Sequence, residues 1–494
     1  VYNGEIYNAP ELRRELKKHG LPFETRCDTE VITVSAEKYG FDFVNDLEGM
    51  FAFALWDRKE KRLLLARDGL GVKPLIYRID PDGIRFASEA KSLYADPDLD
   101  WNVDPTALHH YLGLNYIPAP FTIYKETRKL EQGEILIWKQ GESRKEIFWS
   151  PPTEKSHDHH PEEVGEKVRS LVMDSVEGQL QSDVPLGVFL SSGTDSAVVL
   201  ECSLARSKNA PRAFCVGFRE SSFDERPGAR ETANILGAEM TELVLEPHIR
   251  DQIPEMAHHF DEPFADSSAV PVWELCRQAS KHITVALSGE GGDEVFCGYQ
   301  PYHAHLYALF MQKLYLDKLA APLNFLLNKI PASDKKTTTI YKLTRFLPHV
   351  SESIAARHFL WKVIFSEERK QRLYTTEWKK QNPRLNNTLN LWEEKFRALE
   401  RHDPVSRAAL ADMGIYLPYD ILTKVDISSM AHSLEVRVPL LDRRIIEYVS
   451  PLPDSEKIDF FRKKKPLRAG FENERSRPIF HRPKQGFSIP ASKW

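Results

Sequence analysis

A stretch near the middle of the chain, residues 184–200, constrains the fold more than any other. An apolar run with the pattern of a buried strand is followed by six small or polar residues (191–196) and then by apolar residues at helical spacing. Small side chains let backbone N–H groups approach an anion, and the free amides at a helix start present positive dipole charge to it. The stretch predicts a strand, a phosphate-binding loop and a helix that opens at Asp195 or Ser196.

The loop contains a carboxylate, which sets it apart from other phosphate loops. No Gly-Lys-Ser/Thr follows its glycine, and it lacks the three spaced glycines of a dinucleotide fingerprint. We expect Asp195 to hold Mg²⁺ while the loop amides and the hydroxyls of Ser191, Thr194 and Ser196 hold a pyrophosphate. A serine-rich helix cap between a core strand and a core helix is the alternative, and the loop alone leaves the two interpretations about equal.

A second polar loop follows a later strand. Residues 212–218, 239–245 and 283–287 are predicted strands with a helix at 225–237, and this alternation implies a parallel sheet whose ligands bind at the carboxyl ends of the strands. The last strand leads into residues 288–294, which are rich in glycine and carboxylates. Asp293 could share Mg²⁺ with Asp195, since Mg²⁺ takes one or two carboxylates plus substrate phosphates, and Glu290 could be a general base. A solvated glycine-rich turn is the alternative.

The first 150 residues have another pattern, and a chain of 494 residues exceeds the size of one core. Helices are predicted from Pro10 to Gly20 and over 29–39, with strands over 49–56 and 62–66. The first of these strands is apolar on both faces, so it needs two covering layers. A polar turn joins the two strands, which predicts an antiparallel hairpin with helices outside.

Four motifs of this half, residues 1–8, 25–31, 47–57 and 67–75, together resemble the glutaminase domain of class II amidotransferases. The resemblance implies that Asn3 and Gly4 form the oxyanion hole, where preorganised donors stabilise acyl transfer. It also implies that glutamine is bound by Asn3, Gly4, Glu5 and Asp28. For Asn3-Gly4 alone, a hairpin turn would be the preferred interpretation.

That family attacks the glutamine amide with an N-terminal cysteine, which has no match in this sequence. Cys27 cannot replace it, because it lies beside Asp28 and a neighbouring carboxylate disfavours the thiolate. Since the sequence begins at Val1 within a motif and stops abruptly at Trp494, we expect truncation at both ends rather than natural loss of the nucleophile. The chain as given is expected to use free ammonium and not glutamine.

The phosphate loop resembles the Ser-Gly-Gly-x-Asp-Ser loop of ATP pyrophosphatases, which cleave ATP between its α and β phosphates. Ser192 replaces the first glycine, at a cost of about 1 kcal/mol if the backbone there needs a positive φ. Residues 288–294 resemble the Ser-Gly-Glu-Gly-Ala-Asp-Glu motif of asparagine synthetases, whose glutamate deprotonates or positions ammonia. The implied nucleotide and pyrophosphate contacts are Leu190, Ser191, Ser192, Gly193, Thr194, Asp195, Ser196, Val216, Ser288 and Gly289.

Further segments resemble the synthetase family. Residues 464–468 match its Lys-x-x-Leu-Arg, which places the transition-state lysine on Lys464, where a cation would neutralise charge on the breaking phosphate bridge. A basic surface run over 462–465 is the alternative. The mixed charges over 423–442 predict a buried ionic network lining the site. Residues 261–268 are a weaker candidate for an acyl-substrate contact, 484–490 match the family's last motif, and the helical pattern of 300–410 is expected to pack over the sheet.

The order of the two resemblances is that of the glutamine-dependent asparagine synthetase family. It implies α/β and α+β folds in two domains: an N-terminal αββα antiparallel sandwich of the Ntn-hydrolase kind, and a C-terminal parallel-sheet α/β domain, adenine nucleotide alpha hydrolase-like, with extra helices. The implied activity is ATP-dependent amidation of aspartate through β-aspartyl-AMP, with ammonia from glutamine and with ATP and Mg²⁺ as cofactors. A relative that adenylates another carboxylate, as β-lactam synthetases do, and a non-catalytic homologue remain alternatives.

The glutaminase domain is expected over 1–150, a linker over 151–165 and the synthetase domain over 166–494. The linker holds His157, His159 and His160, whose spacing fits no tetrahedral metal signature. The net charge of −5 argues against a dedicated nucleic-acid binder, and no apolar run approaches the ~18 residues of a membrane span. Five scattered cysteines fit a reducing compartment, so a cytoplasmic protein with small-molecule substrates is expected, with a homodimer left open.

Overall fold

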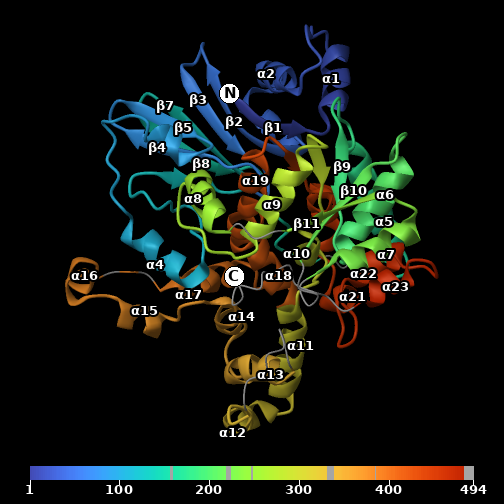
Figure 1. Cartoon of the computed structure of the whole chain (residues 1–494). Helices are drawn as coiled ribbons and strands as arrows, with labels where there is room; N and C mark the ends of the chain where they lie inside the picture. The colour runs from blue at the N-terminus through green and yellow to red at the C-terminus, as the bar shows by residue number, and fades with distance from the viewer. Residues whose placement is uncertain are drawn as a thin grey trace.

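The computed structural model describes residues 1–155, 160–218, 224–245, 249–330, 339–383, 385 and 387–482. Two sheet-containing halves lie side by side, and a group of helices extends away from them (Figure 1). Among the helices in the described ranges, none is long and apolar enough to cross a membrane. Two of the linker histidines, His157 and His159, lie outside the described residues.

The N-terminal half contains two antiparallel sheets. Helices α1 (Ala9–Lys18) and α2 (Asp28–Tyr39) cover one face of the larger sheet, whose other face packs on the smaller sheet. Helix α3 (Ala90–Leu93) packs on the outer face of the smaller sheet, so the αββα prediction is confirmed. The larger sheet has the order β1 (Tyr2–Ile6), β2 (Gly49–Asp57), β3 (Arg62–Arg67), β7 (Glu134–Lys139), β8 (Glu142–Ile147), and the smaller β5 (Gly83–Ala87), β4 (Ile76–Asp80), β6 (Arg128–Lys129).

The predicted helices and strands of this half are present within a few residues of the expected positions. The prediction that β2 is buried on both faces is confirmed for residues 50–53, which lie between the helices α1 and α2 and the smaller sheet. For Trp56 the prediction is wrong, because this residue lies at the end of β2 beside the polar turn and is 48% exposed. The apolar pattern thus extends further along the strand than the covering layers do.

The loop of residues 67–75 is folded around its own first two side chains. The buried carboxylate of Asp68 accepts backbone N–H groups of Leu70, Val72 and Lys73, at 2.9 to 3.1 Å. The guanidinium of Arg67 donates to the carbonyl oxygens of Gly71, Lys73 and Leu130. These bonds satisfy the polar groups of a buried loop, as burial requires, and they direct Lys73 toward the other half of the molecule.

The C-terminal half is built on one parallel sheet, as predicted. Its helix α6 (Thr194–Arg206) begins one residue earlier than expected. Helices α5 (Val164–Gln179), α6 and α7 (Arg226–Leu236) pack on one face of the sheet, and α9 (Ala269–Ala279) and α19 (Leu422–Met430) pack on the other. The strand order is β11 (Met240–Val244), β10 (Arg212–Gly217), β9 (Leu186–Phe189), β12 (Val285–Leu287), β13 (Glu435–Arg437).

The helices of residues 300–410 do not pack over the sheet, so this expectation is wrong. Their buried aromatic residues, among them Tyr302, Trp392 and Phe396, pack on α18 (Pro404–Ile415), which lies between them and the rest of the domain. Helices α11 to α13 project away from the body in Figure 1. This helical group contains α11 (Gln300–Lys313), α12 (Ala320–Leu327), α13 (Thr339–Phe346), α14 (Ile354–Lys362), α15 (Glu367–Leu373), α16 (Thr376–Gln381) and α17 (Thr388–Ala398).

The other helices are short or connect the larger elements. Helix α4 (Pro105–Leu114) starts as its sequence indicates, with the Asp104 carboxylate accepting N–H groups of Thr106 and Ala107 and with Pro105 in the first turn. The remaining α-helices of the described residues are α8 (Ile249–Phe260), α10 (Gly292–Val295), α20 (Arg443–Val449), α21 (Asp454–Lys457), α22 (Lys465–Phe471) and α23 (Arg477–His481).

The ionic network predicted over 423–442 is present and buried. Lys424, Asp426 and Arg437 are 3–7% exposed, and each has a partner of opposite charge. The network only partly lines the synthetase site, since Asp426 bonds to Lys73 of the N-terminal half at 2.8 Å. The Lys73–Asp426 ion pair therefore fastens the two halves together across a buried boundary.

We expect Lys73→Met to lower the free energy of unfolding by about 3–5 kcal/mol, because it leaves the Asp426 carboxylate buried without its cation. The double variant Lys73→Met/Asp426→Leu should recover most of the loss, since two apolar side chains need no partner. Urea titration followed by tryptophan fluorescence measures both. A single variant as stable as the unsubstituted chain would show that water already screens this pair.

Candidate active site

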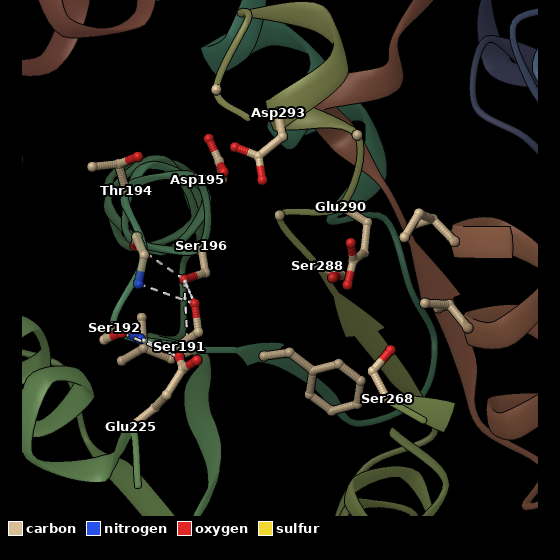
Figure 2. Close-up of a pocket in the computed structure, with 18 of the residues that line it drawn as sticks. Ser191, Ser192, Thr194, Asp195, Ser196, Glu225, Ser268, Ser288, Glu290 and Asp293 are labelled. Atoms are coloured by element: carbon tan, nitrogen blue, oxygen red, sulfur yellow. Dashed lines mark hydrogen bonds between the residues drawn. The ribbon is translucent and has the colours of Figure 1, made fainter. Parts of the chain in front are cut away.

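A cavity of about 510 Å³ lies at the carboxyl ends of β9, β10 and β12. One wall is the loop of residues 190–196 with the start of α6, and the facing wall is the loop of residues 288–294 (Figure 2). Residues from the far C-terminal part, including Lys464 and Arg468, close one side. The sheet therefore brings together the segments that the sequence predicted to bind a nucleotide, and all ten predicted nucleotide and pyrophosphate contacts line this cavity.

The loop of residues 190–196 is held by its own hydroxyl groups. The Ser196 hydroxyl accepts the N–H of Ser191 at 3.1 Å and lies 3.0 Å from the Ser191 hydroxyl, while the N–H of Gly193 donates to the Ser191 hydroxyl. Helix α6 begins at Thr194, so the free amides and the positive end of its dipole lie at the cavity wall. No side chain caps the start of α6, so the structure does not support the serine-rich helix cap, and the first-turn amides are available to an anion.

Ser192 carries no backbone strain. It is not among the residues with positive φ, so the expected cost of about 1 kcal/mol does not arise there. Its side chain fits because Gly228 lies opposite: a Cβ added to Gly228 would lie 2.8 Å from the Cβ of Ser192. The N–H and the hydroxyl of Ser192 both donate to the buried carboxylate of Glu225, at 3.0 and 3.2 Å.

Two carboxylates and one lysine converge at one end of the cavity. Asp195 and Asp293 face each other in Figure 2, and both form ion pairs with the ammonium of Lys464, at 2.6 Å for Asp293. Burial lowers the pKa of Lys464, but Asp195 and then Asp293 raise it above its ordinary value, so the side chain stays charged. Lys464 is 8% exposed, and its backbone is left-handed, with a φ of 54°. A lysine of a basic surface run would be exposed to solvent, so that alternative is wrong for Lys464.

The donor set at this end fits Mg²⁺. Asp195 and Asp293 reach the same ammonium group, so a single cation lies within reach of both carboxylates. Hard oxygen ligands from one or two carboxylates, completed by substrate phosphates, are what Mg²⁺ prefers. Among the described residues, no group of three or more metal-ligating side chains occurs.

The glycines of the second loop are required by close packing. A Cβ on Gly289 would lie 2.6 Å from the backbone nitrogen of Ser196, and a Cβ on Gly292 would lie 2.6 Å from the carboxyl carbon of Asp195. A Cβ on Gly298 would lie 2.0 Å from both Asp293 Oδ1 and Lys464 Cε. Because these positions have no side chain, the loop of residues 288–294 and Asp293 can lie in contact with the start of α6. The alternative of a solvated glycine-rich turn is therefore wrong.

We expect Gly289→Ala to reduce pyrophosphate release about 100-fold, because it pushes the loop of residues 288–294 away from α6 and a misplacement of about 1 Å costs that much. Gly178→Ala is the matched control, since a Cβ there meets nothing within 4 Å. The control should keep its activity and gain up to about 1 kcal/mol of stability from the better helix former. Steady-state pyrophosphate release and thermal unfolding measure the two; unchanged kinetics for Gly289→Ala would contradict the packing argument.

Glu290 lies on the wall opposite the phosphate loop, next to Ser288 (Figure 2). Its negative charge acts on Lys424. Burial lowers the pKa of this lysine, but the charges of Asp266, Asp420 and Glu290 raise it above its ordinary value. Lys424 donates to Asp266 at 2.7 Å and to the Ser268 hydroxyl at 2.8 Å. The weaker candidate segment 261–268 thus does reach the cavity, through Asp266 and Ser268.

Two buried acids near this end were not predicted. Burial, followed by the charge of Asp266, raises the pKa of Asp420 to about 8. Burial, followed by Asp293, raises the pKa of Glu294 to about 8, and Glu294 accepts a hydrogen bond from Tyr299 at 2.9 Å. The sequence offered a signal only for Glu294, which is part of residues 288–294. Glu294 lines the cavity, and so do four further charged side chains that were not predicted as site residues: Glu225, Lys463, Arg468 and Arg482.

In the N-terminal half, Asn3 and Gly4 lie within β1 and not in a turn, so the hairpin-turn alternative is wrong. Gly4 has a φ of 145°, and a Cβ there would lie 2.0 Å from the carbonyl oxygen of Met50, so only glycine fits beside β2. Asp28 accepts the Tyr2 hydroxyl at 2.5 Å and the N–H of Ile6 at 3.1 Å, which places its carboxylate beside β1. Glu5 lies on the same strand; partial burial raises its pKa, Arg437 opposes this shift, and Asp28 adds to it.

The last predicted motif, residues 484–490, lies outside the described residues. The two candidate sites lie in different halves of the molecule. A small cavity of about 80 Å³ lies between the halves, lined by residues of both, among them Met50, Trp149 and Val438.

Comparisons with known proteins agree with this architecture. The family model described as asparagine synthase matches residues 167–494, and the glutamine amidotransferase domain model matches residues 1–149. Asparagine synthetase (glutamine-hydrolyzing) 1 of Bacillus subtilis is 33% identical over 500 residues, which cover 100% of this chain and 76% of that protein. A putative asparagine synthetase (glutamine-hydrolyzing) of Mycobacterium tuberculosis is 32% identical over 511 residues, covering 100% of this chain and 75% of that protein.

A more distant relative has another name: amidase chry2 of Gibberella zeae is 26% identical over 554 residues, covering 100% of this chain and 77% of that protein. Fold, site and matches define a class of protein in which a glutamine amidotransferase domain precedes a synthase domain with a parallel sheet. Within that class, this chain belongs to the asparagine synthase family.

Proposed function

We propose that this protein uses ATP to amidate the side-chain carboxylate of aspartate, giving asparagine, AMP and pyrophosphate. The observation that carries the proposal is the convergence of Asp195, Asp293 and Lys464 beside the phosphate loop, with Glu290 on the facing wall. One end of the cavity is built to hold and cleave a polyphosphate, and the other holds a carboxylate that can accept a proton.

In the first step, an oxygen of the aspartate β-carboxylate attacks the α-phosphorus of ATP. A P–O bond forms, the bond to the β,γ-diphosphate breaks, and pyrophosphate leaves, giving β-aspartyl-AMP. Charge increases on the bridging oxygen as the bond breaks, and the Lys464 ammonium, kept charged by its two carboxylates, stabilises it. Mg²⁺ held by Asp195 and Asp293 would supply further charge neutralisation when bound.

In the second step, ammonia attacks the activated carbonyl carbon. A C–N bond forms, the proton released by the nitrogen passes to Glu290, and AMP leaves with the electrons of the C–O bond. Glu290 lies on the wall away from the phosphate loop, which is where the acyl end of the intermediate is expected. Lys424, Asp266 and Ser268 lie beside it and are suited to the charged α-groups of an amino acid substrate.

The N-terminal half is proposed to supply ammonia by glutamine hydrolysis in the complete enzyme. Asn3 and Gly4 would form the oxyanion hole, Asp28 would bind the α-ammonium of glutamine, and Glu5 would make another contact with glutamine. We propose residues 1–150 as this glutaminase domain, 151–165 as the linker and 166–494 as the synthetase domain. ATP-bound Mg²⁺, a cytoplasmic location, a homodimer and the absence of nucleic acid as a partner belong to the same set of proposals.

A related enzyme that adenylates another carboxylate is the second candidate, because relatives named as amidases match the whole chain. The test is a screen of pyrophosphate release with ATP, Mg²⁺, ammonium and one carboxylate at a time. Aspartate-dependent release with equimolar asparagine is the expected result. Release that depends on a different carboxylate favours the second candidate, and no release with any carboxylate favours a non-catalytic homologue.

A further inference from the structure

Arg437 is a buried arginine at the boundary between the two halves, 3% exposed at the end of β13. Its Nη1 donates to the carbonyl oxygens of Gln179 and Gln181, at 2.8 and 2.7 Å, where α5 ends. Its Nε donates to Glu435 at 2.6 Å. These three bonds clamp the guanidinium from the synthetase side, with one nitrogen left to face the N-terminal half.

That nitrogen reaches the proposed glutamine site. Nη2 of Arg437 lies 3.5 Å from the Glu5 carboxylate on β1, and the guanidinium carbon lies 5.7 Å from the centre of the Tyr7 ring. Partial burial raises the pKa of Glu5 to about 7, against the lowering effect of Arg437. A neighbouring cation favours the charged form of Glu5, and in this structure Arg437 is such a cation, 3.5 Å away.

The backbone of the same residue holds the synthetase loop. Strand β13 pairs in parallel with β12, with Arg437 opposite Leu287. The carbonyl oxygen of Arg437 accepts the N–H of Ser288 at 2.8 Å. Ser288 is the first residue of the segment that carries Glu290 and Asp293, so one residue contacts the glutamine site through its side chain and the synthetase loop through its backbone.

We propose that Arg437 is a positioning residue that couples glutamine binding in the N-terminal half to the loop of residues 288–294 in the synthetase half. The inference rests on the proposed function, in which Glu5 contacts glutamine. Glutamine that binds the Glu5 carboxylate competes with the Arg437 guanidinium for it, so Arg437 holds different positions in the free and glutamine-bound forms. Its main-chain bond to Ser288 passes this difference to the loop, and the coupling acts equally in both directions.

The test is calorimetric titration of L-glutamine into the full chain, with and without saturating aspartate, Mg²⁺ and α,β-methylene-ATP, an analogue that cannot be cleaved at the reacting bond. Glutamate is assayed to confirm that the ligand stays intact. We expect the Kd of glutamine to change at least about fivefold between the two conditions, the lower end of usual couplings. In Arg437→Met the ratio of the two Kd values should fall to one, while ammonium-dependent asparagine formation, which keeps the main-chain bond, persists.

Arg443→Met is the matched control, because Arg443 also bridges the halves, donating to the carbonyl oxygen of Asn45 at 2.9 Å, while its Nε donates to Glu447 and not to Glu5. It should keep the ratio of the unsubstituted chain. If Arg437→Met fails to fold, Arg437→Lys carries the test: its single ammonium cannot hold Gln179, Gln181 and Glu5 together, so the ratio should fall toward one.

Three outcomes would overturn the coupling: a ratio of one in the unsubstituted chain, an unchanged ratio in Arg437→Met, or equal losses in Arg437→Met and Arg443→Met. Each leaves the proposed function standing if aspartate-dependent pyrophosphate release is intact. Absence of that release in the unsubstituted chain would refute the proposed function itself, so the two failures are distinguishable.

Discussion

Replacement of Lys464 by methionine is expected to lower kcat for pyrophosphate release about 10²–10³-fold, the usual loss when one preorganised charge at a developing anion is removed. The ammonium contacts both Asp195 and Asp293 and is buried at the phosphate end of the cavity. Methionine keeps most of the volume but leaves the bridging oxygen without its cation. The KM for aspartate should change little, since aspartate binds at the other end. Initial rates at saturating Mg²⁺ and ATP give both constants.

Lys465→Met is the control for this prediction, because it removes a neighbouring positive charge. Lys465 donates to the carbonyl oxygen of Ser455 and lies 3.6 Å from Asp459, and it does not line the cavity. Its rate should stay within about twofold of the unsubstituted chain. Equal losses in the two variants would mean that the basic run acts through its overall charge and not through a specific contact of Lys464.

Glu290→Ala is expected to separate the two half-reactions. A general base contributes about 10²–10⁴-fold to the step in which it accepts the proton, so asparagine formation should fall by that factor. Pyrophosphate release precedes this step and should fall less than about tenfold, with β-aspartyl-AMP lost to hydrolysis. The ratio of asparagine to pyrophosphate, measured in the same reaction mixture with ammonium as nitrogen donor, should fall from one to below about 0.1.

Glu225→Gln provides the comparison within the same cavity. Glu225 accepts the N–H and the hydroxyl of Ser192 beside the phosphate loop, across the cavity from Glu290 (Figure 2). Whatever loss this variant suffers should affect pyrophosphate and asparagine alike, so the product ratio stays near one. If Glu290→Ala also keeps a ratio near one, Glu290 acts in adenylation and not in the attack by ammonia.

Some parts of the site could be predicted from the sequence because their signals are local. The loop of residues 190–196 and the start of α6 follow from small residues between a strand and a helix pattern, and the helix boundary was off by one residue. The role of Ser192 could not be judged in this way. The Ser192 side chain fits because it packs against Gly228, which lies 36 positions further along the chain. No local sequence pattern describes such a contact.

Two acids at or near the site carry no local signal in the sequence. Asp420 is buried and feels the charge of Asp266, and Glu225 accepts the N–H of Ser192 in the phosphate loop; both features depend on residues far away in the sequence. The helical region of residues 300–410 was misplaced for a related reason. Its apolar pattern shows that these helices pack against something, and the pattern is equally compatible with a sheet or with α18.

By itself, the sequence determined the alternation of strands and helices, the antiparallel and parallel halves and their order, and the two loops that line the cavity. These depend on interactions between residues a few positions apart, which are the same in any fold. Only the tertiary structure decided that Lys464 meets Asp195, 269 residues away, and that Arg437 contacts Glu5 and Ser288. These contacts depend on how the sheets and helices pack. The sequence contains many charged residues of each sign, and only the packing determines which of them meet.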